Sequence, residues 1–87
     1  MNLLSIRNKL NNIDTKIVRL IAKRQSYMPA VGAYKKKHGL AINQKDRELA
    51  IIEALKKMSV EEGVSQALVE SIFKLIFKDS KKIQKEV

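Results

Sequence analysis

Five polar or charged residues interrupt helix faces that are otherwise apolar in this chain of 87 residues. They are Arg24, Lys35, Glu48, Ser80 and Gln84. Guanidinium and ammonium groups pair with carboxylates and phosphates, and neutral hydrogen-bonding groups help to orient such a ligand. The chemistry that this set supports is the binding and electrostatic stabilisation of an anion.

The elements that must position these residues are helices. Apolar residues recur at helical spacing almost from end to end, with neither an alternating strand pattern nor an internal repeat. The length suits one all-α domain over residues 1–87 with a single core. The chain contains no cysteine, so a disulfide or a cysteine-based zinc site cannot stabilise it, and packing or a partner subunit must do so.

The positions of glycine, proline and N-cap residues predict three helices. Gly39 would end the first helix and Gly63 the second, because glycine readily adopts the left-handed conformation that follows a helix. Asn43 and Ser65 would supply N-caps for the second and third helices. Pro29 would kink the first helix without ending it, since the apolar period continues past it. The expected helices are about 35, 18 and 21 residues long. The first covers about residues 3–37, the second follows Asn43 and ends at about residue 62, and the third follows Ser65 and runs to the C-terminus.

The first helix carries two cations on one face. Arg24 occupies a heptad position that is otherwise apolar along this helix. Lys35 follows eleven residues later, close to three full turns, so both side chains share a face. Burying two cations without a partner costs several kcal/mol, and we therefore expect an anion between them.

The other helices show the same kind of interruption. Glu48 lies one turn before the apolar stripe of the second helix, and Ser80 and Gln84 continue the stripe of the third. Each alone could be a helix-end side chain that reaches solvent, but jointly they predict one polar cavity. A structural network in which Glu48 neutralises Arg24 and Lys35 is the alternative. Two cations facing one acid favour a ligand that carries carboxylates or phosphates.

Arg7 lies seventeen residues before Arg24, about 26 Å along a helix, too far for one small ligand to touch both in one protomer. If two long helices pack antiparallel about a two-fold axis, Arg7 of one chain approaches Arg24 of the other. Such a homodimer would also cover the part of the first helix, about 50 Å long, that its own chain cannot. A surface charge beside the dimer seam is the other interpretation of Arg7.

Several short motifs follow one another in an order that is typical of a known family. They are Leu4-Ser5-Ile6-Arg7, Ile13-Asp14, Arg24, Val31-Gly32-Ala33-Tyr34-Lys35, Asp46-Arg47-Glu48 and Asp79-Ser80-Lys81-Lys82-Ile83-Gln84. Over essentially the whole chain, these motifs resemble the AroQ-type chorismate mutases. The resemblance implies an intertwined antiparallel homodimer of three-helix protomers. It also implies rearrangement of chorismate to prephenate, a step toward phenylalanine and tyrosine, without metal, cofactor or covalent intermediate.

The resemblance further implies which residues bind the carboxylates of chorismate. Arg24 and Arg7 of the partner chain would clamp them, and Arg47 would assist from the start of the second helix. Ser80 would bind the ring carboxylate.

The remaining site residues would act on the ether oxygen and the ring hydroxyl. Lys35 and Gln84 would donate hydrogen bonds to the ether oxygen, where charge develops in the transition state. Glu48 would accept a hydrogen bond from the ring hydroxyl. A lyase of the same fold, resembling isochorismate-pyruvate lyase, would retain most of these residues, and Glu48 favours the mutase.

The net charge of +9 leaves a second class of function open, a basic helical module that binds nucleic acid. The chain has two Tyr, two Phe and no Trp, so it lacks the aromatic platform that many such modules use. Its apolar stretches are too short to span a membrane, and no signal peptide is evident. We therefore expect a cytosolic enzyme that binds neither nucleic acid nor membrane.

A broad pH profile is the first testable prediction. The amide of Gln84 donates at any ordinary pH, because it carries no titratable proton. Mutase activity should therefore change little between about pH 6 and pH 8, measured as initial rates at saturating chorismate. A steep loss of activity within that interval would contradict the assignment of Gln84.

Overall fold

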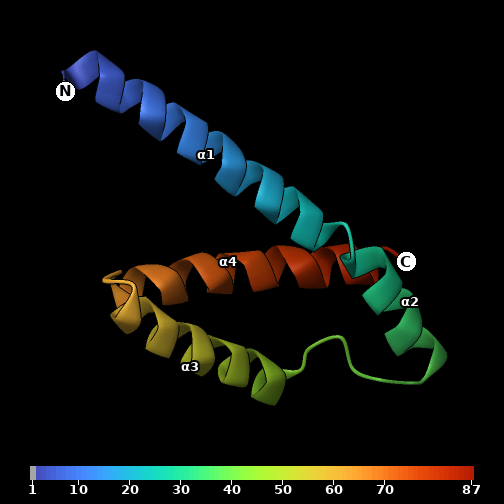
Figure 1. The fold of residues 1–87 in the computed structure, drawn as a ribbon. Coiled ribbons are helices and arrows are strands. Elements are labelled where there is room, and N and C mark those ends of the chain that lie inside the picture. Colours follow the sequence, from blue (N-terminus) through green and yellow to red (C-terminus); the bar gives the residue numbers. More distant parts are fainter. Residues whose placement is uncertain (1) are drawn as a thin grey trace.

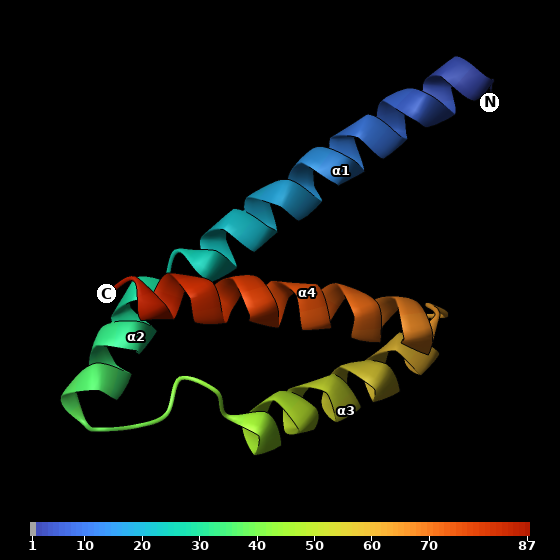
Figure 2. The same ribbon diagram turned by 180° about the vertical axis from the view of Figure 1, so that it is seen from behind.

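The computed structural model describes residues 2–87, which form four helices and no strand. The helices are α1 (Leu3–Gln25), α2 (Met28–Lys37), α3 (Lys45–Glu61) and α4 (Gln66–Lys85). Helices α3 and α4 run side by side in opposite directions, and α2 crosses the C-terminal end of α4 (Figure 1). The view from behind shows α1 projecting away from the other helices (Figure 2). The all-α prediction is confirmed.

The long first helix expected at residues 3–37 is divided into α1 and α2 by a turn at Ser26 and Tyr27. Pro29 explains the division. Within a continuous helix, its ring would clash with the carbonyl group four residues earlier, which belongs to Gln25, the last residue of α1. The prediction of a kink within one helix is therefore wrong, and Pro29 instead occupies the first turn of α2.

The ends of the other helices agree with the sequence except at one cap. The two predicted left-handed stops have φ angles of 64° and 71°, at Gly39 and Gly63. The Ser65 hydroxyl accepts a hydrogen bond from the first turn of α4 at 3.2 Å, as expected of an N-cap. The prediction that Asn43 caps α3 is wrong. Helix α3 begins at Lys45, so Gln44 holds that position, without a side-chain capping bond. The Asn43 side chain instead accepts a hydrogen bond from Lys81 of α4 at 3.4 Å.

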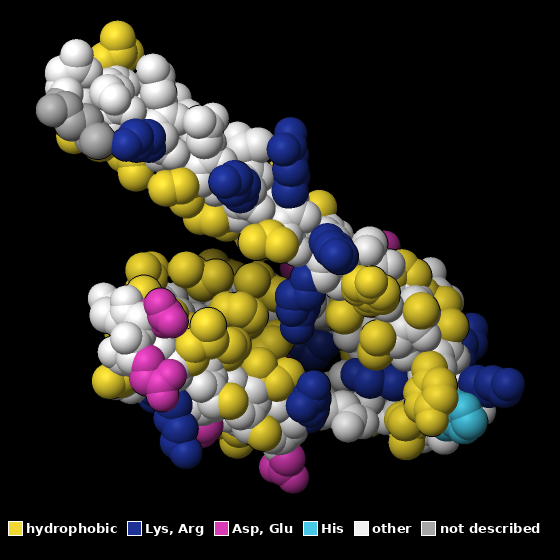
Figure 3. Space-filling view, viewed as in Figure 1, with side chains coloured by type: hydrophobic (Ala, Val, Ile, Leu, Met, Phe, Trp, Pro, Cys, Tyr) yellow, Lys and Arg dark blue, Asp and Glu magenta, His cyan; other side chains and the backbone are white. Residues whose placement is uncertain are grey.

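The core within one chain is small. Among residues 2–87, Ile52 and Phe77 are the only apolar side chains that are buried, and α1 contributes none. The radius of gyration is 16.1 Å, whereas a compact chain of this length has about 12 Å. Apolar side chains line the side of α1 that faces α4 across open space (Figure 3). Exposed apolar residues of α1 include Leu3, Ile6, Leu10, Ile13, Ile17 and Leu20.

Helix α2 lies very close to α4 at Gly32, which is buried. A Cβ atom at this position would lie 2.6 Å from the carbonyl oxygen of Gln84 and 2.8 Å from its Cα atom. Backbone atoms of a helix cannot swing aside as a flexible side chain can. The absence of a side chain at Gly32 therefore sets the distance between α2, which carries Lys35, and the end of α4.

Replacement of Gly32 by alanine should lower the free energy of unfolding by about 1–3 kcal/mol, because the methyl group forces α2 away from α4. This loss should outweigh the gain of about 1 kcal/mol that alanine brings to a helix interior. Thermal unfolding measures the change, and Ala33→Ser, at the exposed neighbouring position, is the control. A melting temperature of Gly32→Ala equal to that of the unmutated protein would show that the helices tolerate the methyl group.

Candidate active site

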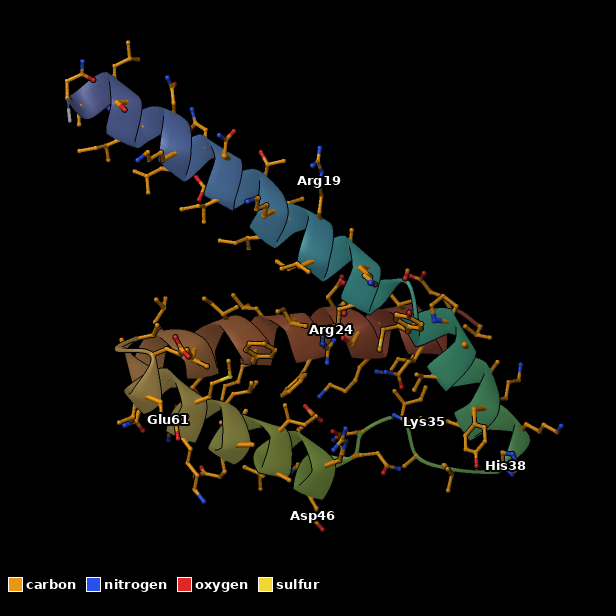
Figure 4. The ribbon with its side chains drawn as sticks, viewed as in Figure 1. Arg19, Arg24, Lys35, His38, Asp46 and Glu61 are labelled. Carbon is orange, nitrogen blue, oxygen red and sulfur yellow. The ribbon has the colours of Figure 1, made fainter. Side chains whose placement is uncertain are left out.

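A cavity of about 350 Å³ opens where the four helices come together. Six of the seven predicted site residues line it, namely Arg24, Lys35, Arg47, Glu48, Ser80 and Gln84. Arg24 from α1 and Lys35 from α2 extend into the region between α2, α3 and α4, whereas Arg19 points away from it (Figure 4). The expectation that these residues from all the helices meet at one cavity is therefore confirmed, and apolar side chains complete its lining.

Arg7 is the predicted site residue that this cavity does not include. It lies in the N-terminal half of α1 and is exposed. Because α1 projects away from the other helices, Arg7 cannot reach the cavity of its own chain (Figure 1). A role for Arg7 in binding would need a second chain.

The cavity face of the first two helices continues across the turn between them. Arg24, Met28, Val31 and Lys35 all line the cavity, at intervals of four, three and four residues. This spacing is that of one helix face, so the break changes the direction of the chain without changing which residues point inward. The predicted shared face of Arg24 and Lys35 is confirmed.

Arg24 is held at the C-terminal end of α1 by a polar cluster. Its Nη1 atom donates to the Ser80 hydroxyl at 2.9 Å and to Oε1 of Gln25 at 2.7 Å. The Gln25 amide nitrogen also donates to the Ser80 hydroxyl, at 2.9 Å, and to Oδ2 of Asp79, at 3.0 Å. The guanidinium carbon lies 5.6 Å from the ring centre of Phe77, within cation–π range. These contacts aim Arg24 into the cavity while several of its N–H groups remain free.

Lys35 and Gln84 form the second polar pair. The Lys35 ammonium group donates to Oε1 of Gln84 at 2.8 Å and to the carbonyl oxygen of Ile42 at 3.0 Å. Lysine has no acceptor, so this bond fixes which end of the Gln84 amide faces it. The Gln84 amide nitrogen then faces Sδ of Met28 at 3.5 Å, a weak acceptor. Both side chains therefore keep donor capacity for a ligand.

Glu48 pairs with Lys81, a residue that we did not assign to the site from the sequence. The Lys81 ammonium nitrogen lies 3.1 Å from Oε1 and 3.3 Å from Oε2 of Glu48. Within residues 2–87, no carboxylate lies within ion-pair distance of Arg24 or Lys35. Glu48 therefore pairs with Lys81 and with neither Arg24 nor Lys35, which disfavours the alternative of a structural network that neutralises these two cations.

The electrostatics of the cavity favour an anion. Its charged lining comprises Arg24, Lys35, Arg47 and Lys81 as cations and Glu48 as the single carboxylate. Burial lowers the pKa of Arg24. Burial also lowers the pKa of Lys35, and repulsion from Lys81 adds to this effect while Glu48 opposes it. A bound anion would relieve this penalty on the charged forms.

Two residues of the site, Lys81 and Gln25, were not predicted from the sequence. Lys81 lies four residues after Phe77 and three before Gln84, so helical spacing alone puts it on the cavity face of α4. Gln25 carried no such signal, because its role depends on α1 ending at that residue.

In the described part of the chain, no three His, Cys, Asp or Glu side chains gather as a metal site requires, and no helix is long and apolar enough to cross a membrane.

Comparison with known proteins gives the family. The model of the chorismate mutase type II family matches residues 6–85. A chorismate mutase from Methanocaldococcus jannaschii is 34% identical over 84 residues, which cover 97% of this chain and 85% of that protein. The chain therefore belongs to the chorismate mutase type II family.

Longer proteins are similar to this chain over part of their length. The T-protein of Haemophilus influenzae is 30% identical over 86% of the chain. A bifunctional chorismate mutase/prephenate dehydratase of Buchnera aphidicola subsp. Schizaphis graminum is 31% identical over 99% of the chain. The chain spans about a fifth of each of these two proteins, 20% and 22% respectively.

Arg24→Ala should lower kcat/KM for chorismate by a factor of about 100 or more, because a charge-assisted clamp is lost from the transition state. Steady-state kinetics measure this loss, and thermal unfolding checks that the fold is intact. Arg19→Ala removes the same charge from a position on α1 that points away from the cavity and should be nearly silent. Equal kinetics for the two variants would remove Arg24 from the site.

Proposed function

We propose that this cavity is where the protein, as a chorismate mutase, rearranges chorismate to prephenate in the biosynthesis of phenylalanine and tyrosine. The observation that carries the proposal is the pair of partly buried cations, Arg24 and Lys35, which have no carboxylate partner within residues 2–87. Chorismate carries two carboxylates, so its binding supplies the missing negative charge.

The carboxylates of the substrate are bound by arginine and serine. Arg24 and Arg47 contact them from α1 and α3, and Arg7 of the partner subunit completes the clamp. Ser80 binds the ring carboxylate. Its place in the cavity lining beside Arg24 supports this role. To bind a carboxylate, its hydroxyl hydrogen turns to the ligand from the Ile76 carbonyl oxygen, which accepts it at 2.8 Å.

The ether oxygen of chorismate receives hydrogen bonds from Lys35 and Gln84. The ammonium group of Lys35 uses two of its three donors within the protein, and the Gln84 amide nitrogen has only a thioether for a partner. The hydrogen bond between the two side chains holds them in place before substrate arrives. Preorganised donors of this kind stabilise the negative charge that develops as the ether bond breaks.

The reaction itself needs no nucleophile or base, because the bonds break and form within one substrate molecule. The protein lowers the barrier by holding the flexible dianion in its compact reactive conformer. Glu48 contributes by accepting a hydrogen bond from the ring hydroxyl. This contact is compatible with its bond to Lys81, because each carboxylate oxygen has a further lone pair.

The functional unit is an intertwined antiparallel homodimer. The accessible surface of one chain is 7018 Å², whereas a folded monomer of this mass exposes about 5,200 Å². The excess is about 1,800 Å² per chain, and two such surfaces match the interface of an obligate dimer. The apolar side of α1, about 35 Å long, is the surface that a second α1 covers.

The antiparallel arrangement explains how Arg7 reaches a site. One α1 helix running against another brings the N-terminal half of each toward the C-terminal end of its neighbour. We further propose that residues 1–87 form one catalytic domain, which the family match over residues 6–85 supports, and that this biosynthetic enzyme works in the cytoplasm.

A complementation experiment tests the reaction and the shared site together. Arg7→Ala and Arg24→Ala should each be nearly inactive alone, whereas a mixture refolded together should recover about a quarter of the unmutated activity. Each mixed dimer then has one site with both arginines intact. The loss of chorismate absorbance measures the rate, and identification of prephenate excludes a lyase reaction.

The two parts of the proposal fail in different ways. No turnover of chorismate by the unmutated protein would refute the function. Turnover without recovery in the mixture would refute the contribution of Arg7 from the partner subunit and leave the reaction in place.

A further inference from the structure

We propose that Lys81 is a positioning residue of this site, whose ammonium group holds and neutralises the Glu48 carboxylate so that Glu48 can bind the ring hydroxyl of a dianionic substrate. The inference rests on the proposed function and adds a residue to it. It follows from three observations, namely the hydrogen bonds of Lys81, its contrast with Lys35, and the space around Glu48.

All three donors of the Lys81 ammonium group have protein partners. The Lys81 ammonium nitrogen lies 3.1 and 3.3 Å from Oε1 and Oε2 of Glu48. It lies 3.4 Å from Oδ1 of Asn43. An ammonium group has three hydrogens and no acceptor, so these three oxygens can engage all of them. Lys81 therefore acts on the substrate through Glu48 and not by direct contact.

Lys35 lines the same cavity and differs in this respect. Its two partners, the Ile42 carbonyl and the Gln84 amide, are neutral oxygens, so both its charge and one hydrogen remain available. The charge of Lys81 is instead matched by Glu48. The two lysines thus have different roles, because Lys35 is available to the ligand and Lys81 is paired with Glu48.

A cation beside Glu48 has two effects on the site, one electrostatic and one steric. A carboxylate in a cavity that binds a dianion repels both substrate carboxylates unless a nearby cation cancels its field. Glu48 and Lys81 also line a neighbouring cavity of about 370 Å³, so Glu48 without its partner has space into which to rotate. The ion pair, with 30% and 23% of the two side chains exposed, keeps the carboxylate on the substrate side.

A double-mutant cycle tests the inference. Lys81→Met keeps most of the unbranched side chain and removes its charge, and it should lower kcat/KM for chorismate by about 10- to 100-fold. In a Glu48→Gln background, the same substitution should cost less than about threefold, because the carboxylate that it positions is absent. Lys81→Arg should retain most of the activity, since a guanidinium group also pairs with a carboxylate.

Lys82→Met is the matched control, because it removes the same charge from the next, exposed position of α4 and should change kcat/KM by less than about twofold. Equal losses from Lys81→Met in both backgrounds would overturn the inference and indicate a direct contact with substrate. A loss that appears as a lower melting temperature, with kcat/KM preserved in the folded fraction, would also overturn it. Absence of turnover by the unmutated protein would overturn the proposed function and this inference with it.

Discussion

The close contact between α2 and α4 at Gly32 is the constraint on which the cavity depends. Because the backbone of Gln84 fills the space where a side chain would be, the two helices meet at a distance that no other residue permits. That distance allows the Lys35 ammonium group to reach the Gln84 amide at 2.8 Å. The orientation of two donors at the heart of the proposed site therefore depends on a residue that has no functional group.

The charged side chains of the cavity lining leave it with a net positive charge. Glu48, the carboxylate of the lining, is paired with Lys81, and the remaining cations are left without acidic partners within residues 2–87. Arg24 is instead held by neutral groups, the Ser80 hydroxyl and the Gln25 amide oxygen, which orient it without cancelling its charge. Neutral hydrogen bonds thus provide the geometry while the positive potential of the cavity is preserved.

The sequence predicted which side chains line the cavity better than it predicted the path of the chain. The shared face of Arg24 and Lys35 depends only on their spacing, and that spacing persists because α2 resumes in phase after the turn. The break itself was missed because the apolar pattern does not record the clash between the ring of Pro29 and the preceding turn. Lys81 was missed for another reason. Lysine is so common on exposed helix faces that position alone does not distinguish an inward one, and only the opposing Glu48 does so.

The uncovered apolar side of α1 has a consequence for how the activity in a cell depends on the concentration of the chain. In the proposed dimer, subunit association supplies most of the apolar burial that an isolated chain lacks, so folding and assembly are one bimolecular process. Where the dimer is weakly populated, the concentration of active dimer then rises with the square of chain concentration, and the active fraction rises in proportion to it before it saturates. Expression level acts as a threshold for such a protein, and newly made chains gain full protection from proteolysis only when they meet another copy.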